Sequence, residues 1–393
     1  MSVLGVAVAI AVAGPIRAAE ISFAANTTGK NVEFLSRTRC TPPAHRPLIA
    51  GTKKTPMKLR EFAKQLGLSP TTVSRALSGY PEVSATTRAR VASEAIRLGY
   101  RPDINAVRLK TGRAGAIGVM MARSGEIHFA EFMSGMAQRL ETADTDILIT
   151  PITAHNDDDE MQAYRRLVES RRVDAVIIHS PRPKDPRIEL LSSLRLPFLV
   201  HGRSETEHVH AWLDIDNENA VRRSTEHLLD LGHRRIAMIN GLKGKTYSIH
   251  REQGFRLAHQ ERGLIADPNM MVCDKFSDES GFRHARSFLE RANGPTAIVA
   301  GSTMTALGVY RAVRSLGMMV GQDVSVIAHD DVFPYLTAEN MVPSLSTTRS
   351  SMRAAGTRCA ELALQLIAGR AAEEIHELWP VELILRESTA PPR

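Results

Sequence analysis

The side chains of this 393-residue chain that bear most directly on function are basic and lie close together in the sequence. Thirteen lysines and arginines occur between Lys53 and Arg113, against only four acidic residues. This local excess is larger than the +7 net charge of the whole chain, so the remaining residues are slightly acidic overall. A local concentration of cations favours binding to the phosphates of nucleic acid. The segment therefore predicts a nucleic-acid-binding module.

The residues around these cations predict short helices that would present them. Apolar residues at the spacing of one buried helix face are Leu59, Phe62, Ala63 and Leu66, and Gly67 then ends the helix. Ser69 is an N-cap type and Pro70 suits the first helical position, so a second helix begins here. Its Val73 and Leu77 can pack inward. The side chains left on its outer face are Thr71, Thr72, Ser74 and Arg75.

A third helix follows in the same pattern. Ser84 can cap it, Val91, Ala95 and Leu98 form its apolar stripe, and Gly99 ends it. Three short helices, the second with a small polar first turn, predict a helix-turn-helix.

The segments LGLSPTTVSRALSG, VSATTRARV and LGYRPDINAVRLKTG resemble the DNA-binding headpiece and hinge of the LacI family of bacterial transcription regulators. By that resemblance the second helix enters the major groove of double-stranded DNA. Pro70, Thr71 and Arg75 then read base edges, and Thr72 and Ser74 lie near phosphates. Arg75 is the strongest candidate because a guanidinium can bond guanine O6 and N7 together, although a solvated or phosphate-bound arginine is the alternative. Pro70 departs from the bulkier polar residues common in the family and offers only apolar contact.

The resemblance assigns residues 57–102 to the headpiece and 103–112 to a hinge helix and linker. The stretch 103–109 is too short to form a stable helix alone in water, so we expect it to fold on DNA. Leu109 would be an apolar wedge in the minor groove, followed by Lys110 along the groove. The alternative for Leu109 is an ordinary linker leucine.

Residues 113–393 alternate short apolar runs with amphipathic segments of helix length. The apolar runs are 116–121, 147–149, 175–178, 198–200, 236–239, 297–300 and 324–328. Such alternation predicts parallel sheets covered by helices on both faces, and the length suggests two similar lobes. The predicted fold is therefore a small all-α headpiece followed by a two-lobed α/β domain, and the lobes resemble those of periplasmic sugar-binding proteins.

Ligands of such domains bind at the carboxyl ends of strands, in the cleft between the lobes. Polar residues at family positions that commonly touch the effector are His201, Asp216, Arg251 and Asp330. An arginine paired with carboxylates suits the hydroxyls of a sugar. Three of these residues also have a structural alternative: a turn for Asp216, a turn or cap for Asp330 and an exposed helix start for Arg251. Gly301-Ser302 stands where the family often has Asn-Asp, which leaves the effector's identity open.

The combination of IAHDDVFPYL, LGLSPTTVSRALSGYPEVS and VHGR resembles repressors of alpha-glucoside operons. The resemblance implies a homodimer that binds a pseudo-palindromic operator and is switched by an alpha-glucoside, free or phosphorylated. A phosphorylated sugar would need extra donors. Lys243, Lys245 or Arg203 could supply them, and the sequence does not decide this.

The first 56 residues differ in character from the rest. Residues 3–13 are almost continuously apolar and Ala18-Ala19 could be a signal cleavage site, although no basic residue precedes the run. An exported periplasmic solute-binding protein is therefore the alternative function. The headpiece argues against export, so we expect a cytoplasmic protein that contacts no membrane, and an extension that is disordered or precedes the true start at Met57.

Motifs of catalysis and of cofactor binding are missing from the sequence. Cys40, Cys273 and Cys359 fit neither zinc spacing nor a disulfide framework. The run 156–160, one asparagine followed by four acidic residues, could suggest a metal, but a solvated helix start explains it better. There is also no phosphate loop and no GxSxG nucleophile elbow. We therefore expect no enzymatic activity, no cofactor and no metal.

Overall fold

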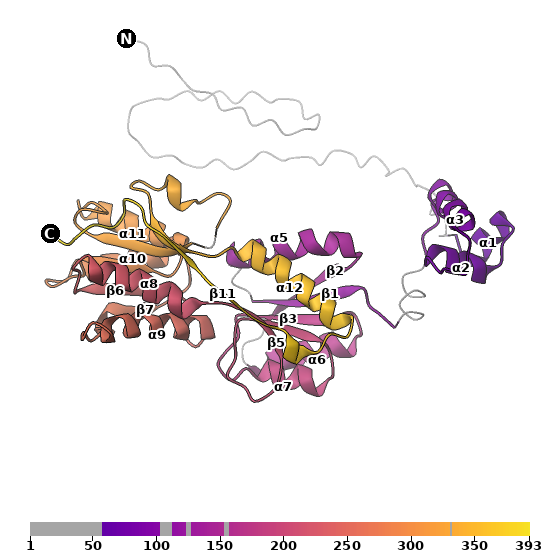
Figure 1. The fold of residues 1–393 in the computed structure, drawn as a ribbon, viewed down its shortest axis with the longest axis horizontal. Coiled ribbons are helices and arrows are strands. Elements are labelled where there is room, and N and C mark those ends of the chain that lie inside the picture. The colour runs from indigo at the N-terminus through magenta and orange to yellow at the C-terminus, as the bar shows by residue number, and fades with distance from the viewer. Residues whose placement is uncertain (1–56, 103–111, 123–126, 153–156, 331) are drawn as a thin grey trace, which may run out of the picture. The chain divides into compact units, whose positions relative to one another are not determined.

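The computed structural model describes residues 57–102, 112–122, 127–152, 157–330 and 332–393 (Figure 1). The chain divides into two compact units, one ending at Tyr100 and the other comprising Arg101–Arg393. The predicted extension 1–56 and the predicted hinge residues Leu109 and Lys110 lie outside the described residues.

The first unit contains the predicted helices within its described residues. They are α1 Leu59–Leu66, α2 Pro70–Leu77 and α3 Ala85–Leu98. The Ser69 hydroxyl accepts a hydrogen bond from the Thr72 amide at 3.0 Å, and Ser84 caps α3 through the Thr87 amide at 3.2 Å. Gly67 ends α1 with a φ of 65°, a left-handed conformation that favours glycine. Local capping chemistry thus fixes the ends of these helices.

A small apolar core holds the three helices together. Phe62, Val73 and Val91 are completely buried, one from each helix. The ring of Phe62 stacks on Tyr100 with centroids 4.2 Å apart. This packing holds α2 in place with its outer face toward solvent.

The second unit contains two lobes, each built on a six-stranded sheet within the described residues. The strands of the first lobe are β1 Ala116–Ala122, β2 Asp146–Ile152, β3 Ala175–His179, β4 Phe198–His201, β5 Ala211–Ile215 and β11 His376–Trp379. Their order is β11-β5-β4-β3-β1-β2, and every pair is parallel. The helices of this lobe are α5 Ile127–Leu140, α6 Asp157–Glu169, α7 Pro186–Ser193 and α12 Met352–Ile367. Alternate strand residues pack against α5 and α12 on one face and against α6 and α7 on the other.

The second lobe repeats this arrangement. Its strands are β6 Ile236–Asn240, β7 Met271–Cys273, β8 Ala297–Ala300, β9 Ser325–Asp330, β10 Ser346–Arg349 and β12 Glu382–Ile384. Their order is β12-β10-β9-β8-β6-β7, with only β12 antiparallel to its neighbour among the described strands. Its helices are α8 Asn217–Asp230, α9 Thr246–Gln260, α10 Asp278–Leu289 and α11 Thr303–Ser315. One face of the sheet packs against α8 and α9, and the other against α10 and α11.

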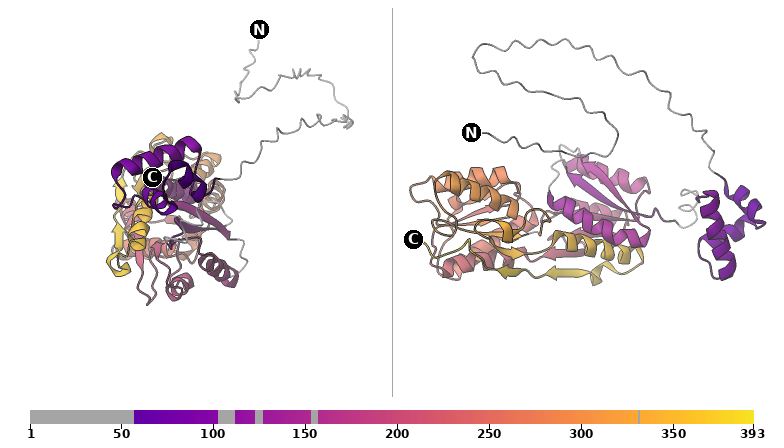
Figure 2. Two further views of the ribbon diagram at one scale, coloured as in Figure 1. Left: turned by 90° about the vertical axis from the view of Figure 1, so that its right-hand side faces the viewer. Right: turned by 90° about the horizontal axis from the view of Figure 1, so that it is seen from above.

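Short 3-10 helices complete the described elements: η1 Glu141–Ala143, η2 Pro268–Met270, η3 Ala338–Asn340 and η4 Ala372–Glu374. The chain passes between the lobes after β5, after β10 and after β11 within the part that the structure describes. The C-terminal segment, yellow in Figure 2, accordingly runs along both lobes. Among the described residues, no helix combines the length and the apolar character needed to cross a bilayer.

Candidate DNA-binding face and effector cavity

The outer face of α2 carries the residues that the sequence predicts for DNA reading. Pro70, Thr71 and Arg75 are exposed. Thr72 and Ser74 are half-buried, and the Thr72 hydroxyl lies 2.8 Å from the Ser69 hydroxyl, within the cap of the helix. The five residues thus share one helix. Exposed Arg75 is the member with the longest reach and the one side chain of the set that carries charge.

Other arginines of the headpiece are engaged in holding its own structure. The Arg88 guanidinium donates to the Val83 carbonyl at 2.6 Å, and Arg90 donates to the Leu66 carbonyl at 2.9 Å. Arg97 pairs with Glu94 at 2.6 Å. The Arg75 guanidinium, by contrast, has no polar partner in the described part of the chain, which leaves its donors for a ligand.

In the second unit, the carboxyl ends of β3, β4 and β5 meet the first turns of α8 and α9 around a cavity of about 70 Å³. His201 and Arg251, both predicted from the sequence, line it together. Residues that the sequence analysis missed also line it: His128, His179, Asp214, Asn217, Tyr247 and Phe276. The cavity is smaller than the roughly 300–1,000 Å³ typical of ligand pockets.

Arg251 on α9 is buried, with 4 % of its surface exposed. Its Nε donates to the Asn217 side-chain oxygen at 2.7 Å, and an Nη donates to the Gly301 carbonyl at 2.6 Å. The centre of its guanidinium lies 5.5 Å from the Tyr247 ring and 5.4 Å from the Phe276 ring, within the range of cation–π attraction. These contacts fix the guanidinium in the cavity wall.

His179 and His201 end adjacent parallel strands and are paired in register. Their Nδ1 atoms lie 2.9 Å apart, and the ring of Phe132 stacks on His201 with centroids 4.7 Å apart. Burial lowers the pKa of His201 to about 4. Burial also lowers the pKa of His179 well below its usual value, reinforced by the nearby His201 and His128. Both imidazoles are therefore neutral at physiological pH.

The carboxylate that lines the cavity is Asp214, two residues before the predicted Asp216. Its Oδ2 accepts from Arg203 Nε at 2.8 Å and lies 3.8 Å from His250 Nδ1. Burial raises the pKa of Asp214 above the usual carboxyl value, against the opposing effect of Arg203. Because Arg203 belongs to the first lobe and His250 to α9, this cluster spans the two lobes.

The two predicted aspartates have other contacts. Asp216 is the N-cap of α8 and accepts from the Asn219 amide at 3.1 Å. Asp330 ends β9 with 2 % of its surface exposed and accepts from the Val332 amide at 2.9 Å. Neither side chain is among the described residues that line the cavity, so the structure groups His201 with Arg251 and places these two carboxylates elsewhere.

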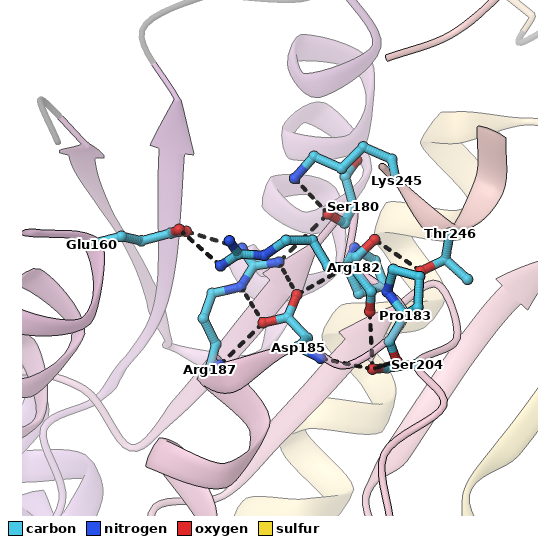
Figure 3. Close-up of polar contacts among 10 residues, drawn as sticks. Glu160, Ser180, Arg182, Pro183, Asp185, Arg187, Ser204, Lys245 and Thr246 are labelled. Atoms are coloured by element: carbon cyan, nitrogen blue, oxygen red, sulfur yellow. Dashed lines mark hydrogen bonds and ion pairs between the residues drawn. The ribbon is translucent and has the colours of Figure 1, made fainter. Parts of the chain in front are cut away.

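The lobes are also bridged by hydrogen bonds between the start of α9 and the segment that follows β3 (Figure 3). The Lys245 ammonium donates to the Ser180 carbonyl at 3.1 Å. The Thr246 amide and hydroxyl both donate to the Pro181 carbonyl, at 3.0 Å and 2.9 Å. Ser180 and Pro181 follow β3 in the first lobe, whereas Lys245 and Thr246 begin α9 in the second. We refer to these four residues as the lobe clamp.

A buried charge network supports the first-lobe half of the lobe clamp (Figure 3). Arg187 pairs with Asp185 at 2.6 Å and with Glu160 at 3.3 Å, and Arg182 also reaches Glu160 at 3.3 Å. Burial opposes the charge on Asp185, but the bonds from Arg187 keep the pKa of this carboxyl below its usual value. Ser180 is held at a φ of 51°, an uncommon conformation for a non-glycine residue. Glu160, the last residue of the run 156–160, is thus an ion-pair partner. The described residues contain no cluster suited to a metal ion.

Comparison with known proteins agrees with both units. Residues 58–103 match the family model for bacterial regulatory proteins of the lacI family, and residues 225–389 match a periplasmic binding protein-like domain. The chain is 44% identical to the HTH-type transcriptional regulator AglR of Rhizobium meliloti (strain 1021), over 86% of this chain and 95% of that protein. It is 34% identical to the regulator RafR of Escherichia coli, over 82% of this chain and 96% of that protein.

Solved structures show the same fold. A lac repressor dimer bound to operator and the anti-inducer ONPF superimposes with a TM-score of 0.75 at 25% identity, covering 86% of this chain and all of that one. A complex of the transcriptional regulator CelR with cellobiose superimposes with a TM-score of 0.63 at 26% identity, covering 84% of this chain and 99% of that one.

A helix-turn-helix unit followed by a two-lobed α/β domain defines a ligand-responsive DNA-binding protein. With relatives of this identity along nearly their whole length, the chain belongs to the lacI family of bacterial transcriptional regulators. It is a regulator of transcription and not an enzyme, and the fold predicted from the sequence is confirmed.

Proposed function

We propose that this protein is a cytoplasmic repressor of carbohydrate-utilisation genes that binds a pseudo-palindromic operator and responds to an alpha-glucoside. The observation that carries the proposal is the combination, in one chain, of an exposed recognition helix and an interlobe cavity lined by Arg251 and His201. The solved CelR structure holds cellobiose, which supports a sugar as ligand for this fold. The assignment to alpha-glucosides rests on the sequence resemblance.

The protein should bind its operator as a dimer, because a pseudo-palindromic operator has two half-sites and each headpiece reads one. One short helix makes too few base contacts for operator affinity, so two headpieces must act together. The second lobe carries a groove of about 1070 Å³ beside α11, with Met319, Tyr335 and Val342 on its rim. Tyr335 and Val342 are 94% and 90% exposed. Exposed apolar side chains at a groove favour association, and we assign this surface, the α11 groove, to the dimer.

The sugar would act by changing the relative position of the lobes. Closing the cleft engages the lobe clamp and Arg251, and the lobes of each subunit then determine the separation of the two hinges. We predict from the sequence that Leu109 and Lys110 of those hinges contact the DNA. Coupling of this kind commonly amounts to about 1–3 kcal/mol, or a 5–150-fold change in affinity. Release of DNA by the sugar is the direction we propose.

The test is fluorescence anisotropy of the full chain titrated onto the DNA that flanks its own gene, at fixed salt. We expect tight, competitor-resistant binding that sucrose, maltose or trehalose weakens. Arg75→Ala should lose specific binding by about 1–3 kcal/mol if the guanidinium reads a guanine. Arg97→Ala is the matched control, because it removes one charge from an arginine already paired within the headpiece.

Two outcomes would contradict the proposal. Equal losses for Arg75→Ala and Arg97→Ala would show that α2 makes no base-specific contact. Absence of specific DNA binding by the unsubstituted protein, with every sugar, would favour the exported solute-binding alternative, against which the full-length similarity to regulators now argues.

A further inference from the structure

A further pocket, of about 310 Å³, lies in the second lobe at the amino ends of its strands. Its lining residues come from the start of β6 and from the segments that precede β6, β7 and β8, strands that run parallel and so share this edge. The volume is at the lower end of the roughly 300–1,000 Å³ typical of ligand pockets. We refer to it as the arginine pocket, because Arg234, Arg235 and Arg291 all line it.

The three arginines of this pocket are held by neutral groups. Each donates to a backbone carbonyl, at 3.0 Å for Arg234, 2.9 Å for Arg235 and 2.9 Å for Arg291. In all their bonds to described residues, Arg234 and Arg291 each use one Nη, and Arg235 uses its Nε. A guanidinium has five N–H groups, so each arginine keeps at least three of them for a ligand.

The positive charge of the arginine pocket is not balanced by carboxylates. Other arginines of this lobe are in ion pairs, such as Arg262 with Asp230 at 2.7 Å and Arg286 with Glu290 at 2.8 Å. None of the three pocket arginines forms an ion pair with a residue that the structure describes. The lining contains one carboxylate, that of Asp267, which caps η2. Three cations against one anion leave an excess of positive charge.

His259 adds an acceptor to these donors. It lies near the end of α9, lines the pocket and is buried, with 3 % of its surface exposed. Burial lowers the pKa of its ring, against the opposing effect of the Phe255 carbonyl, so the imidazole is neutral at physiological pH. That carbonyl accepts from Nδ1 at 2.8 Å, which places the single proton on Nδ1 and leaves Nε2 bare. A bare nitrogen accepts a hydrogen bond from a hydroxyl group.

We propose that the arginine pocket binds a small phosphate monoester that also carries a hydroxyl group, either a sugar phosphate or a nucleotide. The three arginines pair with its phosphate, because guanidinium N–H groups match phosphate oxygens in geometry and charge. A hydroxyl of its carbon portion donates to His259 Nε2, and the buried Ile236 and Met270 give that portion an apolar surface. The proposal is independent of the sugar-responsive function, since the described linings of this pocket and of the interlobe cavity share no residue.

The experiment is isothermal titration calorimetry of the full chain with ribose 5-phosphate and adenosine 5′-monophosphate, each compared with its phosphate-free parent and with inorganic phosphate. We expect at least one monoester to bind at least roughly fivefold more tightly than inorganic phosphate, and its parent not to bind. The monoester that binds more tightly identifies the source of the phosphate, sugar or nucleotide. Because the arginines are exposed, affinity should fall as sodium chloride is raised from about 50 to about 300 mM.

Variants then locate the binding site. Arg235→Gln and Arg291→Gln each remove one cation, and each should weaken monoester binding about 5- to 20-fold. Arg256→Gln is the matched control, since Arg256 is exposed on the same lobe and is paired with Glu252 at 2.8 Å. A far-UV circular dichroism spectrum equal to that of the unsubstituted protein shows that each variant is folded.

Three results would overturn the proposal. If neither monoester binds, or if Arg235→Gln binds as the unsubstituted protein does, the arginines serve only to hold the carbonyls of their own loops. Inorganic phosphate that binds as tightly as both monoesters excludes an organic ligand. Equal losses for Arg235→Gln and Arg256→Gln show attraction by general charge and not by a pocket. Each result leaves the sugar-responsive regulator unaffected, because that function rests on the interlobe cavity.

Discussion

The His179–His201 pair shows at the scale of single residues how burial sets chemistry. Two imidazoles at the ends of neighbouring strands share one hydrogen bond in an apolar wall that includes Phe132. Burial opposes a charge on either ring, and for His179 the neighbouring His201, His128, Lys245 and Arg187 oppose it as well. The pair is therefore held in one charge state across the usual pH range.

This predicts an effector affinity that does not change with mild acidification. Because burial lowers the pKa of His201 to about 4, the ring stays neutral between pH 7.5 and pH 6.0. A histidine with the ordinary pKa of about 6.5 would gain charge over this interval. Calorimetric titration of the bound sugar at the two pH values should give equal affinities. A tenfold weakening at pH 6.0 would show that a histidine titrates in the site.

Stability should respond differently from affinity. In the unfolded chain the same imidazoles titrate near pH 6.5, so below that pH the unfolded state binds more protons than the folded one. The contribution of neutral His201 to the free energy of unfolding has its full value above about pH 6.5. It is lost progressively as the pH falls toward about 4.

At the scale of elements, the lobe clamp joins the segment that follows β3 to the start of α9, 65 positions further along the chain. The Lys245 ammonium and the Thr246 hydroxyl donate to carbonyls that follow β3. Burial lowers the pKa of Lys245, as do the neighbouring Arg187 and Arg182. The first lobe supplies the acceptors and the second lobe the donors, so these bonds form only when the lobes meet.

Removing the side-chain donors of the lobe clamp should therefore weaken sugar binding without touching the sugar. A Lys245→Met, Thr246→Val double variant loses two hydrogen bonds of about 1 kcal/mol each, and we expect roughly a 5- to 30-fold loss of affinity in calorimetric titration. Lys243→Met is the matched control, since Lys243 is exposed two positions away. If the control and the double variant lose affinity equally, the effect is one of general charge and not of the clamp.

Elements with local determinants were predictable from the sequence. The end of α1, the start of α2 and both ends of α3 lie at the predicted residues, because Gly67, Ser69, Ser84 and Gly99 act through bonds to their own neighbourhoods. Strands β1, β3, β4, β6, β8 and β9 follow the apolar runs because both faces of each are buried. Fold class followed from these elements together with the family resemblance.

Other strands gave no such signal. β10 reads Ser-Thr-Thr-Arg, and its buried Ser346 is stabilised by bonds with Ser388 and Arg386 from the C-terminal segment, some 40 positions away. The edge strands β7, β11 and β12 are only three or four residues long. Their pairing depends on partners distant in the chain, which periodicity cannot reveal.

Some residues of the cavity could likewise be predicted from the sequence and others could not. His201 was found because it ends an apolar run, and His179 ends the preceding run, so the same signal was available for it. Asn217, Tyr247 and Phe276 reach the cavity from helix starts and a loop, and only the three-dimensional arrangement brings them together. Asp214, buried within a strand, could not be distinguished by sequence from the neighbouring cap Asp216.

At the scale of the whole molecule, the proposed function requires two chains, whereas the cavity is complete within one. Its lining residues come from both lobes of a single chain in the described structure. The α11 groove lies on the second lobe and shares no residue with that lining. Sugar binding and dimerisation should therefore be separable by substitution.

We expect Val342→Asp to dissociate the dimer. The side chain is 90% exposed at the α11 groove, and a carboxylate there would have to be desolvated in an apolar interface. Light scattering should show a monomer, operator binding should fall because half-sites are read singly, and calorimetric sugar affinity should stay unchanged. Ile265→Asp is the control: Ile265 is an equally apolar residue with 93% exposure, and it lines a different surface pocket. A Val342→Asp protein that remains dimeric would move the dimer interface away from this groove, whereas a monomer with full operator affinity would remove the need for a dimer.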